Sequence, residues 1–260
     1  MRTIVVNNQK GGVGKTTIAL HLAWHYVEQN ERVLFVDLDA QGNATASLAR
    51  ATAEQPRWQA QSCGLAVDLF APPRLEIDPA PPFQLLAASS RLNMVDSALE
   101  VALDAIRAQH DGLSPLFDVC IIDTPPAFGT RNLGALLVCD HLIAPIQLED
   151  YALSGVNDLL KSIAVAEKLR GRRLDFLGLL PSQFRANSSL HRQNLEMLVR
   201  DLGRAALLFP AFLALRQGYV EAVGRGLPVW MIRDNSAAAV AGREMRHVLG
   251  LVADRVALRS

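Results

Sequence analysis

The sequence lacks the features that mark secreted, membrane-spanning and metal-cluster proteins. It has three cysteines among 260 residues, and aromatic side chains make up only 6%. Cys63, Cys120 and Cys139 are odd in number and lack the spacing of a metal or redox site, so we expect reduced core thiols. No apolar run approaches the roughly 20 residues of a membrane-spanning helix. An apolar stretch begins at residue 3, which leaves no room for a signal peptide, and we expect a cytoplasmic protein without stable membrane association.

Net charge is also absent, because 26 Lys and Arg balance 26 Asp and Glu. The balance hides an asymmetry. Residues 1–130 carry 9 basic and 14 acidic side chains, whereas residues 161–260 carry 16 basic and 8 acidic ones. Fourteen of those sixteen are arginines, the residue type that pairs best with phosphate. Any one of these arginines is more often a solvated residue on a helix face than a ligand contact. The excess of arginines in residues 161–260 as a whole, however, favours a phosphate-binding surface.

The feature that the sequence does have is a phosphate-binding loop. Residues 9–17 read Gln-Lys-Gly-Gly-Val-Gly-Lys-Thr-Thr, which fits the pattern GxxxxGK[ST] except for Gln9 at the first glycine. An apolar stretch precedes the loop at 3–6 and helical apolar spacing follows at 18–26. This strand–loop–helix context disfavours the alternative of a plain glycine turn. The predicted ATP-binding residues of the loop are Lys10, Gly11, Gly12, Val13, Gly14, Lys15, Thr16 and Thr17.

Two lysines of the loop are predicted to be catalytic. Lys15 is placed to reach the phosphates, with the Thr16 hydroxyl on Mg²⁺. Lys10, near the start of the loop, cannot easily fold back onto its own nucleotide, but it can point across a subunit interface. There it would add positive charge where the transferred phosphoryl group develops negative charge. This arrangement predicts a dimer that sandwiches ATP.

Acidic residues end two of the predicted strands. Asp123 follows the apolar run 119–122, and Asp37 and Asp39 follow the run 33–36. Ligands of open α/β sheets bind at the carboxyl edge of such strands, where a carboxylate can hold Mg²⁺ through its water shell. The alternative for Asp37 and Asp39 is a helix N-cap or a solvated loop acid.

Four segments together resemble one family. Residues 10–17 resemble the deviant Walker A box of the ParA/MinD family of ATPases. Residues 33–45 resemble its second motif, with Ala40 in place of the usual proline, and residues 117–126 resemble its Walker B strand. Residues 144–155 match a further ParA-type stretch. The resemblance covers essentially the whole chain.

Looser matches point to the plasmid partition branch of the family. Residues 176–182, 215–222 and 226–230 resemble ATPases of the IncC type. The family usually contacts adenine by backbone just after the strand that ends near residue 180, which implies Pro181 and Ser182 as ATP-binding candidates. The N-terminal helix-turn-helix extension of longer plasmid ParA proteins is not found, so autorepression is not expected.

The resemblance also implies roles for the acids. Asp39 is expected to orient or activate the attacking water, and Asp37 to support the magnesium region, so the predicted metal ligands are Thr16, Asp37 and Asp123. The implied cofactors are ATP and Mg²⁺. The implied cycle is an ATP-bound homodimer that binds DNA non-specifically on the nucleoid and is released by a ParB-like centromere-binding protein. Dimerisation would double the basic surface, on which the DNA-binding candidates are Arg216, Arg233, Arg243 and Arg246.

The alternation of strand and helix patterns predicts an α/β fold with a doubly wound, mostly parallel sheet and helices on both faces, as in P-loop NTPases. We expect a single domain, residues 1–260, with an irregular proline-rich surface excursion at 55–82. Predicted strands lie at 3–8, 33–37, 83–87, 117–123, 141–145, 174–180 and 206–209. Predicted helices lie at 15–29, from 44, and at 93–109, 132–139, 154–170, 189–202 and 236–255.

Two other functions remain open. A ParA-like ATPase that positions a protein cargo over the nucleoid would share all the chemistry, and neighbouring genes would separate it from DNA partition. A MinD-like membrane-positioning ATPase needs a basic, amphipathic last helix with bulky anchors. The tail 249–260 has apolar residues but only Arg255 and Arg259 and no aromatic residue, which disfavours this function.

Overall fold

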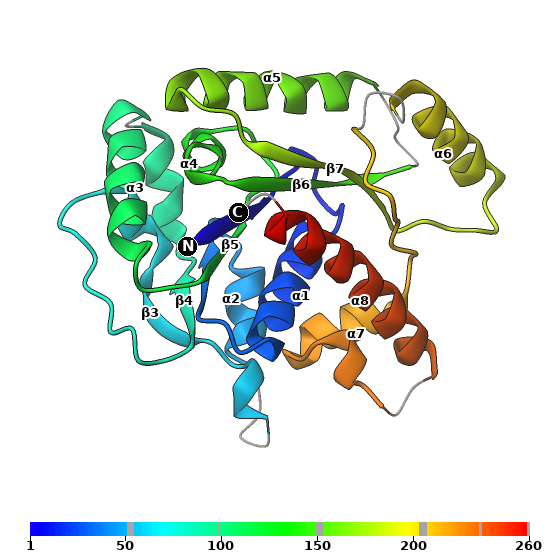
Figure 1. Cartoon of the computed structure of the whole chain (residues 1–260), viewed down its shortest axis with the longest axis horizontal. Coiled ribbons are helices and arrows are strands. Elements are labelled where there is room, and N and C mark those ends of the chain that lie inside the picture. Colours follow the sequence, from blue (N-terminus) through cyan, green and yellow to red (C-terminus); the bar gives the residue numbers. More distant parts are fainter. Residues whose placement is uncertain (51–54, 98, 149–152, 203–206, 234–235, 259–260) are drawn as a thin grey trace.

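In the part of the chain that the structure describes, seven strands form one parallel sheet (Figure 1). The computed structural model describes residues 1–50, 55–97, 99–148, 153–202, 207–233 and 236–258. The strand order β3-β4-β2-β5-β1-β6-β7 confirms the predicted doubly wound sheet. The strands are β1 (Arg2–Val6), β2 (Val33–Asp37), β3 (Gln61–Leu65), β4 (Phe83–Ala87), β5 (Val119–Asp123), β6 (His141–Gln147) and β7 (Asp175–Ser182).

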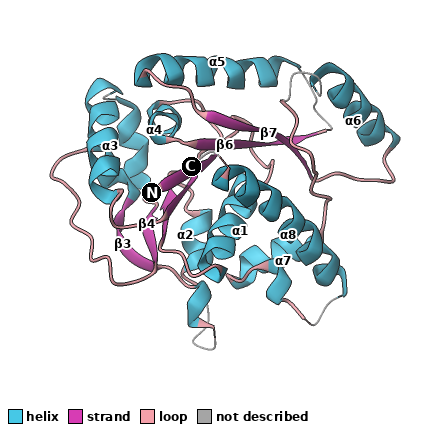
Figure 2. Ribbon diagram, viewed as in Figure 1, coloured by secondary structure: helices cyan, strands magenta, loops and turns pink. Residues whose placement is uncertain are grey.

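Helices cover both faces of the sheet (Figure 2). They are α1 (Lys15–Glu28), α2 (Asn43–Leu48), α3 (Leu99–Leu113), α4 (Thr130–Val138), α5 (Leu153–Arg170), α6 (Ser189–Leu202), α7 (Gln217–Arg225) and α8 (Ser236–Ala257). Helices α1, α2, α7 and α8 pack in the core on one face, whereas α3, α4, α5 and α6 contribute to the core on the other. The predicted three-layer arrangement is therefore confirmed.

The strand β1 shows how the sequence builds both cores at once. Ile4 and Val6 lie in the core beneath α1 and α8, and Val5 lies in the opposite core. All three side chains are fully buried. Because side chains alternate along a strand and helices cover both faces, the central strands read as continuous apolar runs.

One sequence prediction is wrong at the edge of the sheet. Residues 61–65, within the stretch 55–82 that we expected to be irregular, form β3 and pair with β4 in parallel. An edge strand has only one neighbour, and the side chains of β3 are half-buried or exposed. It therefore lacks the apolar run that identified the other strands.

Cys63 lies on this strand and is half-buried rather than in the core, whereas Cys120 and Cys139 are buried as predicted.

Smaller differences concern element ends. The helix predicted at 93–109 begins at Leu99, after a 3₁₀ helix at Ser90–Ser97. Instead of a strand near 206–209, Leu208 makes an isolated bridge to Leu179, and residue 206 lies outside the described residues. Residues 149–152 of the ParA-like stretch also lie outside them.

The order of the sheet reverses at β1, which lies between β5 and β6. Ligands of open α/β sheets bind at the carboxyl ends of the strands beside such a reversal. Strand β1 leads there into residues 7–14, and β2 and β5 end at Asp37 and Asp123, which are paired in register. The topology thus brings the loop and the acids to one edge of the sheet.

Candidate phosphate-binding site

Two glycines give the loop after β1 its shape. Gly12 has a φ of 75° and Gly14 a φ of 93°, in the left-handed region that costs other residues roughly 1–2 kcal/mol. Gly14 is also the N-cap of α1. Successive turns of this kind make an anion-binding concavity in the backbone, and the N-terminal end of the helix adds positive potential. The loop is therefore built to bind an anion such as a phosphate.

Asn8 fixes the start of the loop. Its side-chain Nδ2 donates to the carbonyl of Pro145 at 2.7 Å, and its Oδ1 accepts from the backbone N–H of Lys10 at 3.0 Å. Gln9, at the position of the missing first glycine, donates from Nε2 to Ser162 Oγ on α5 at 3.0 Å. The entry to the loop is thus tied to β6 and α5 before the glycines begin.

Three side chains from β6 and the end of β7 brace the middle of the loop. Ser182 Oγ donates to the carbonyl of Val13 at 2.7 Å, and Gln147 Nε2 donates to the carbonyl of Gly12 at 3.1 Å. Gln183 also donates to the Gly12 carbonyl. These bonds occupy the carbonyl oxygens of Gly12 and Val13 with protein donors. A free carbonyl oxygen that faced the concavity would repel a phosphate. The sequence analysis missed the roles of Gln147 and Gln183, although Gln147 lies in the ParA-like stretch.

Lys15 is held within the site without an ion pair to a carboxylate among the described residues. It is 7% exposed, and its Nζ donates to the carbonyl of Lys10 at 2.7 Å. Burial lowers the pKa of Lys15, while the charges of Asp123 and Asp39 oppose the shift. A poorly solvated ammonium gains from an anionic ligand, so the site favours phosphate beside Lys15. The side chain of Lys10 is half-buried.

Asp123 lies at the end of β5 in a condition that suits a metal ligand. It is 1% exposed, and neither carboxylate oxygen has a hydrogen-bond partner among the described residues. Burial, and next the charge of Asp37, raise the pKa of Asp123 well above its usual range; the Thr16 hydroxyl and Lys15 act in the opposite direction. Unpartnered buried oxygens facing a hydroxyl fit Mg²⁺, which takes few protein ligands and keeps several waters.

Asp37 shapes the loop that carries Asp39. Its Oδ2 accepts from the backbone N–H and the hydroxyl of Thr45 at 2.8 and 2.7 Å, and its Oδ1 accepts from the N–H of Asp39 at 3.2 Å. Asp39 is half-buried and accepts at Oδ1 from the N–H of Gln41 at 3.0 Å. Both oxygens of Asp37 are thus engaged with protein, unlike those of Asp123. Burial raises the pKa of Asp37 to about 6.

These two raised pKa values predict a stability effect. A carboxyl whose pKa is raised binds protons more tightly in the native state, so its contribution to the free energy of unfolding falls as pH rises from about 4 through about 6. We expect Asp123→Asn, without nucleotide, to raise the melting temperature at pH 7.5 by roughly 2–4 °C, which corresponds to about 1 kcal/mol. Thermal melts at pH 5 and pH 7.5 measure it.

A matched control for this prediction is Asp118→Asn. Arg32 pairs with Asp118 at 2.7 Å and lowers the pKa of that carboxyl to about 2. The sign is therefore opposite, and Asp118→Asn should lower the melting temperature at pH 7.5. A lower melting temperature for Asp123→Asn at that pH would contradict the conclusion that the charged Asp123 destabilises the nucleotide-free protein.

A cavity of about 190 Å³ lies beside the loop. Of the two predicted ATP-binding candidates on this side, Ser182 lines the cavity and Pro181 does not. Both belong to β7 rather than to a turn after it, and the carbonyl of Pro181 accepts from the N–H of Leu213 at 2.8 Å. The lining residues are Gly14, Thr17, Ile18, Ser182, Gln183, Leu213, Ala214, Leu215, Arg216, Tyr219 and Val220.

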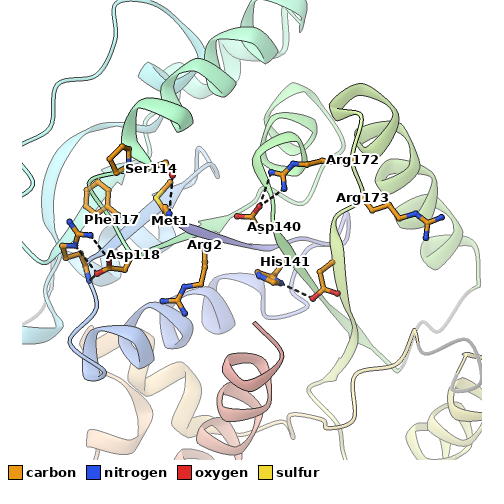
Figure 3. A pocket seen from close by; sticks show the side chains of 12 residues that line it. Met1, Arg2, Ser114, Phe117, Asp118, Asp140, His141, Arg172 and Arg173 are labelled. Carbon is orange, nitrogen blue, oxygen red and sulfur yellow. Dashed lines mark hydrogen bonds and ion pairs between the residues drawn. The ribbon is translucent and has the colours of Figure 1, made fainter. Parts of the chain in front are cut away.

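A larger cavity, of about 680 Å³, lies at the opposite edge of the sheet, around the amino ends of β1, β5, β6 and β7 (Figure 3). Two of its arginines pair with carboxylates of the same cavity. Arg32 lies 2.7 Å from Asp118, and Arg172 lies 3.2 Å from Asp140. Figure 3 shows that Arg172 points to Asp140 while Arg173 points away from the other labelled residues. This cavity lies at the amino ends of the strands and contains no phosphate loop, so the phosphate-binding candidates lie at the other edge of the sheet.

The four predicted DNA-binding arginines lie in different surroundings. Arg216 faces inward and bonds Glu244 through Nε and Nη2 at 3.1 and 2.8 Å. Arg243 and Arg246 are exposed on α8. Arg246 also pairs with Glu28 and stacks over Trp230 at 4.8 Å. Arg233 is exposed, and neither it nor Arg243 has an ion pair among the described residues. Arg216 is therefore placed to organise the cavity wall rather than to contact DNA.

Three comparisons relate these features to known proteins. A family model described as an AAA domain matches residues 1–176. The chain is 35% identical over 255 residues to the protein IncC of Escherichia coli, covering 95% of this chain and 67% of IncC. It is 35% identical over 196 residues to the chromosome-partitioning ATPase Soj of Thermus thermophilus, covering 74% of each.

A solved structure shares the fold. An aspartate-to-alanine variant of Cyanothece McdA, in complex with ATP, superposes with a TM-score of 0.77 over 97% of this chain and 96% of that one. The sequence identity is 20%. At this identity the likeness concerns the fold alone.

Proposed function

The chain belongs to the ParA/Soj/IncC family of partition ATPases, and from this premise we propose that it drives DNA partition through a Mg²⁺-dependent cycle of ATP binding and hydrolysis. In this cycle an ATP-sandwich dimer binds DNA without sequence preference and leaves it after a partner stimulates hydrolysis. One observation carries the proposal: the ammonium of Lys15 and the carboxylate of Asp123 lie close enough for their charges to interact. Lys15 is poorly solvated and follows a loop of glycines with positive φ. The two buried oxygens of Asp123 have no hydrogen-bond partner among the described residues.

The loop residues bind the triphosphate. Backbone N–H groups of the glycine loop surround the β- and γ-phosphates, and Lys15 exchanges the Lys10 carbonyl for phosphate oxygens. Thr16 and Asp123 would hold Mg²⁺, which supplies positive charge that offsets the charge developing on the phosphates. Asp37 acts differently from the sequence prediction, because its oxygens are occupied by Thr45 and Asp39. It fixes the Asp39 loop instead of binding the metal.

Asp39 and Lys10 complete the reaction. Asp39 orients the water that attacks the γ-phosphorus, the bond from that phosphorus to the ADP oxygen breaks, and the proton of the water leaves with the phosphate. Lys10 of each subunit reaches the nucleotide of the other, where it stabilises the transferred phosphoryl group. The base occupies the cavity of about 190 Å³ beside Ser182 and Tyr219.

The DNA-binding surface includes the α8 arginine pair, Arg243 and Arg246, which are i,i+3 neighbours on one helix face.

The last helix does not fit a membrane anchor, because Leu249, Val252 and Val256 are fully buried in the core. No helix among the described residues is long and apolar enough to span a bilayer.

DNA binding by this surface should require ATP and ignore base sequence. The affinity should fall steeply with salt, with a slope of about −0.9 in log K against log salt for each neutralised phosphate. Replacing both members of the α8 arginine pair with glutamate should abolish DNA binding and leave basal ATPase activity within about twofold of wild type, because it reverses the charge of two phosphate contacts. Gel shifts on two unrelated duplexes, with ATP, with ADP and without nucleotide, measure this.

The matched control for Arg243→Glu alone is Arg173→Glu, which makes the same charge change at the opposite edge of the sheet. The control should keep nearly wild-type DNA affinity. Tight binding in ADP, or a strong preference for one duplex, would refute the dimer-assembled surface. Binding to liposomes in place of DNA would favour a membrane-positioning function.

The partner decides between DNA partition and positioning of a protein cargo. We infer a ParB-like centromere-binding partner, since Soj, at 35% identity, is a chromosome-partitioning ATPase. A neighbouring ParB-like gene with DNA repeats is expected. A neighbouring cargo gene, together with stimulation of hydrolysis by the cargo protein, would assign the chain to cargo positioning.

A further inference from the structure

Gln183, directly after β7, has a backbone conformation that is rare for a glutamine. Its φ is 56°, in the left-handed region. The other described non-glycine residue with a positive φ is Asn30 at the end of α1, where helices commonly finish in this conformation. Gln183 follows a strand and has no such local reason. Conformations of this kind cost free energy and gather at functional sites, so a role at the site is expected.

The chain on both sides of Gln183 is held by a neighbouring segment. The carbonyl of Pro181 accepts from the N–H of Leu213 at 2.8 Å, and the N–H of Phe184 donates to the carbonyl of Leu213 at 3.0 Å. The carbonyl of Phe184 accepts from the N–H of Leu215 at 2.9 Å. Because the backbone is fixed before and after Gln183, the left-handed conformation is imposed by tertiary contacts.

This conformation puts two successive side chains on the phosphate loop. Ser182 Oγ donates to the carbonyl of Val13 at 2.7 Å, and Gln183 Nε2 donates to the carbonyl of Gly12. Along a regular strand, successive side chains point to opposite faces. If β7 simply continued, Gln183 would point away from the loop that Ser182 contacts. The positive φ is therefore the feature that brings the second side chain to the loop.

Gln147 closes a ring of hydrogen bonds with Gln183 and Gly12. Its Nε2 donates to the carbonyl of Gly12 at 3.1 Å and to Oε1 of Gln183 at 2.9 Å. Gln183 donates to the same carbonyl, which thus accepts from two side-chain amides. Gln147 ends β6, where it pairs in register with Ser182 of β7. The ring therefore joins the ends of two strands to one carbonyl of the loop.

Fixing these carbonyls also fixes the N–H groups that follow them. A peptide unit is planar and trans, so its C=O and N–H bonds point in opposite directions. The carbonyls of Gly12 and Val13 are held toward the ends of β6 and β7, so the N–H groups of Val13 and Gly14 point away from those strands. Successive N–H groups in such a turn form an anion-binding concavity. The loop is thereby shaped before a ligand arrives, which lowers the cost of ordering it on binding.

We propose that Gln183 is a positioning residue for phosphate binding, whose left-handed backbone places its side-chain amide on the carbonyl of Gly12 and, together with Gln147, shapes the loop for the phosphates. The inference rests on the proposed function, in which this loop binds the triphosphate. Gln183 also lines the cavity of about 190 Å³ to which we assign the base. The test must therefore separate an effect on the phosphates from an effect on the base.

Gln183→Gly tests the inference, because glycine adopts this conformation without steric cost and lacks the amide. The affinities for a non-hydrolysable ATP analogue and for inorganic triphosphate, each with Mg²⁺, are measured by displacement of a fluorescent ATP analogue. Both should fall by about five- to tenfold, as expected for the net contribution of a hydrogen bond. The melting temperature without nucleotide should stay within about 2 °C of wild type, because relief of the left-handed conformation offsets the lost hydrogen bonds.

Two further variants sharpen the test. Asn30→Gly is the matched control, because it makes the same kind of backbone change at the end of α1 that is away from the loop. It should leave both affinities unchanged. Gln147→Leu combined with Gln183→Gly should lower the affinities by less than the product of the two single effects, because both amides act on one carbonyl and on each other. A full product would show independent contributions and would contradict the ring.

The outcomes distinguish this inference from the proposed function. If the wild type does not bind the ATP analogue, the proposed function fails first. If Gln183→Gly loses affinity for the ATP analogue but not for inorganic triphosphate, Gln183 contacts the base and the inference is overturned. It is also overturned if neither affinity falls, or if inorganic triphosphate does not displace the fluorescent analogue from wild type. A fall in both affinities together with a melting temperature lower by several degrees would reduce Gln183 to a structural role and overturn it as well.

Discussion

Lys15→Gln is expected to reduce ATP affinity by on the order of 100-fold or more, whereas Lys10→Ala should leave it nearly unchanged. Lys15 is 7% exposed, and its one hydrogen-bond partner among the described residues is the carbonyl of Lys10. Its replacement removes the charged contact to the phosphates, and it also removes a buried ammonium whose pKa is lowered by desolvation. The melting temperature without nucleotide should not fall.

The effect of Lys10→Ala should appear only after binding. A cation that completes the site across a subunit interface is worth about 10³–10⁵ in turnover in related phosphoryl-transfer enzymes. We expect Lys10→Ala to lose about 10³-fold in ATP turnover and to form no hydrolysis-competent dimer. Isothermal titration with a non-hydrolysable ATP analogue separates affinity from turnover, and analytical ultracentrifugation reports the dimer.

Lys161→Ala is the control for both lysine variants. Lys161 is exposed on α5, and its one ion pair in the part of the chain that the structure describes is with Asp158, three residues away. Its removal should therefore change neither affinity nor turnover. Equal loss of ATP affinity in Lys10→Ala and Lys15→Gln would show that both lysines act on the same nucleotide, and the assignment of Lys10 to the partner's phosphates would then be wrong.

The second large effect is expected at Asp39. Asp39→Ala should bind ATP and form a persistent dimer, with partner-stimulated hydrolysis reduced by about 10²–10⁴-fold, the usual contribution of a positioned acid–base group. Asp39 is half-buried, and its negative charge acts to raise the pKa of Lys15, so the two side chains lie near each other. The side chain can therefore position water beside the phosphates without holding the triphosphate in place.

Turnover with partner, together with the lifetime of the ATP-bound dimer on DNA, measures this prediction. Asp104→Ala is the control, because Asp104 is 83% exposed on α3 and, among the described residues, makes a single i,i+3 ion pair with Arg107. Near wild-type hydrolysis by Asp39→Ala in the presence of partner would assign water activation to another residue. Loss of ATP binding would place Asp39 among the ligands of the triphosphate.

The functional motifs were predictable because they are local. The loop 9–17 lies between a strand and a helix that the sequence shows directly, and Asp37 and Asp123 end apolar strands. Backbone geometry alone then places them at one edge of a parallel sheet. The edge strand β3 was missed for the converse reason, since half of its surroundings are solvent and its sequence carries little pattern.

The division of labour between the acids depends on tertiary contacts. The sequence presents Asp37 and Asp123 as equivalent strand-end carboxylates. The structure gives Asp37 three hydrogen bonds from Thr45 and Asp39, whereas the oxygens of Asp123 have no partner among the described residues. This difference supports the proposal that Asp123 rather than Asp37 holds the metal ion, and hydrogen bonds to a folded loop cannot be predicted from strand periodicity.

The sequence by itself determined the family of this protein and most of its strands and helices, because these follow from patterns between neighbouring residues. Only the tertiary structure decided how the site is braced and connected. Ser182 reaches Val13 across 169 residues of sequence. Glu244 meets Arg216 across 28 residues, after the chain has turned from α7 into α8. Such contacts arise from the packing of whole elements against one another, which no local pattern encodes.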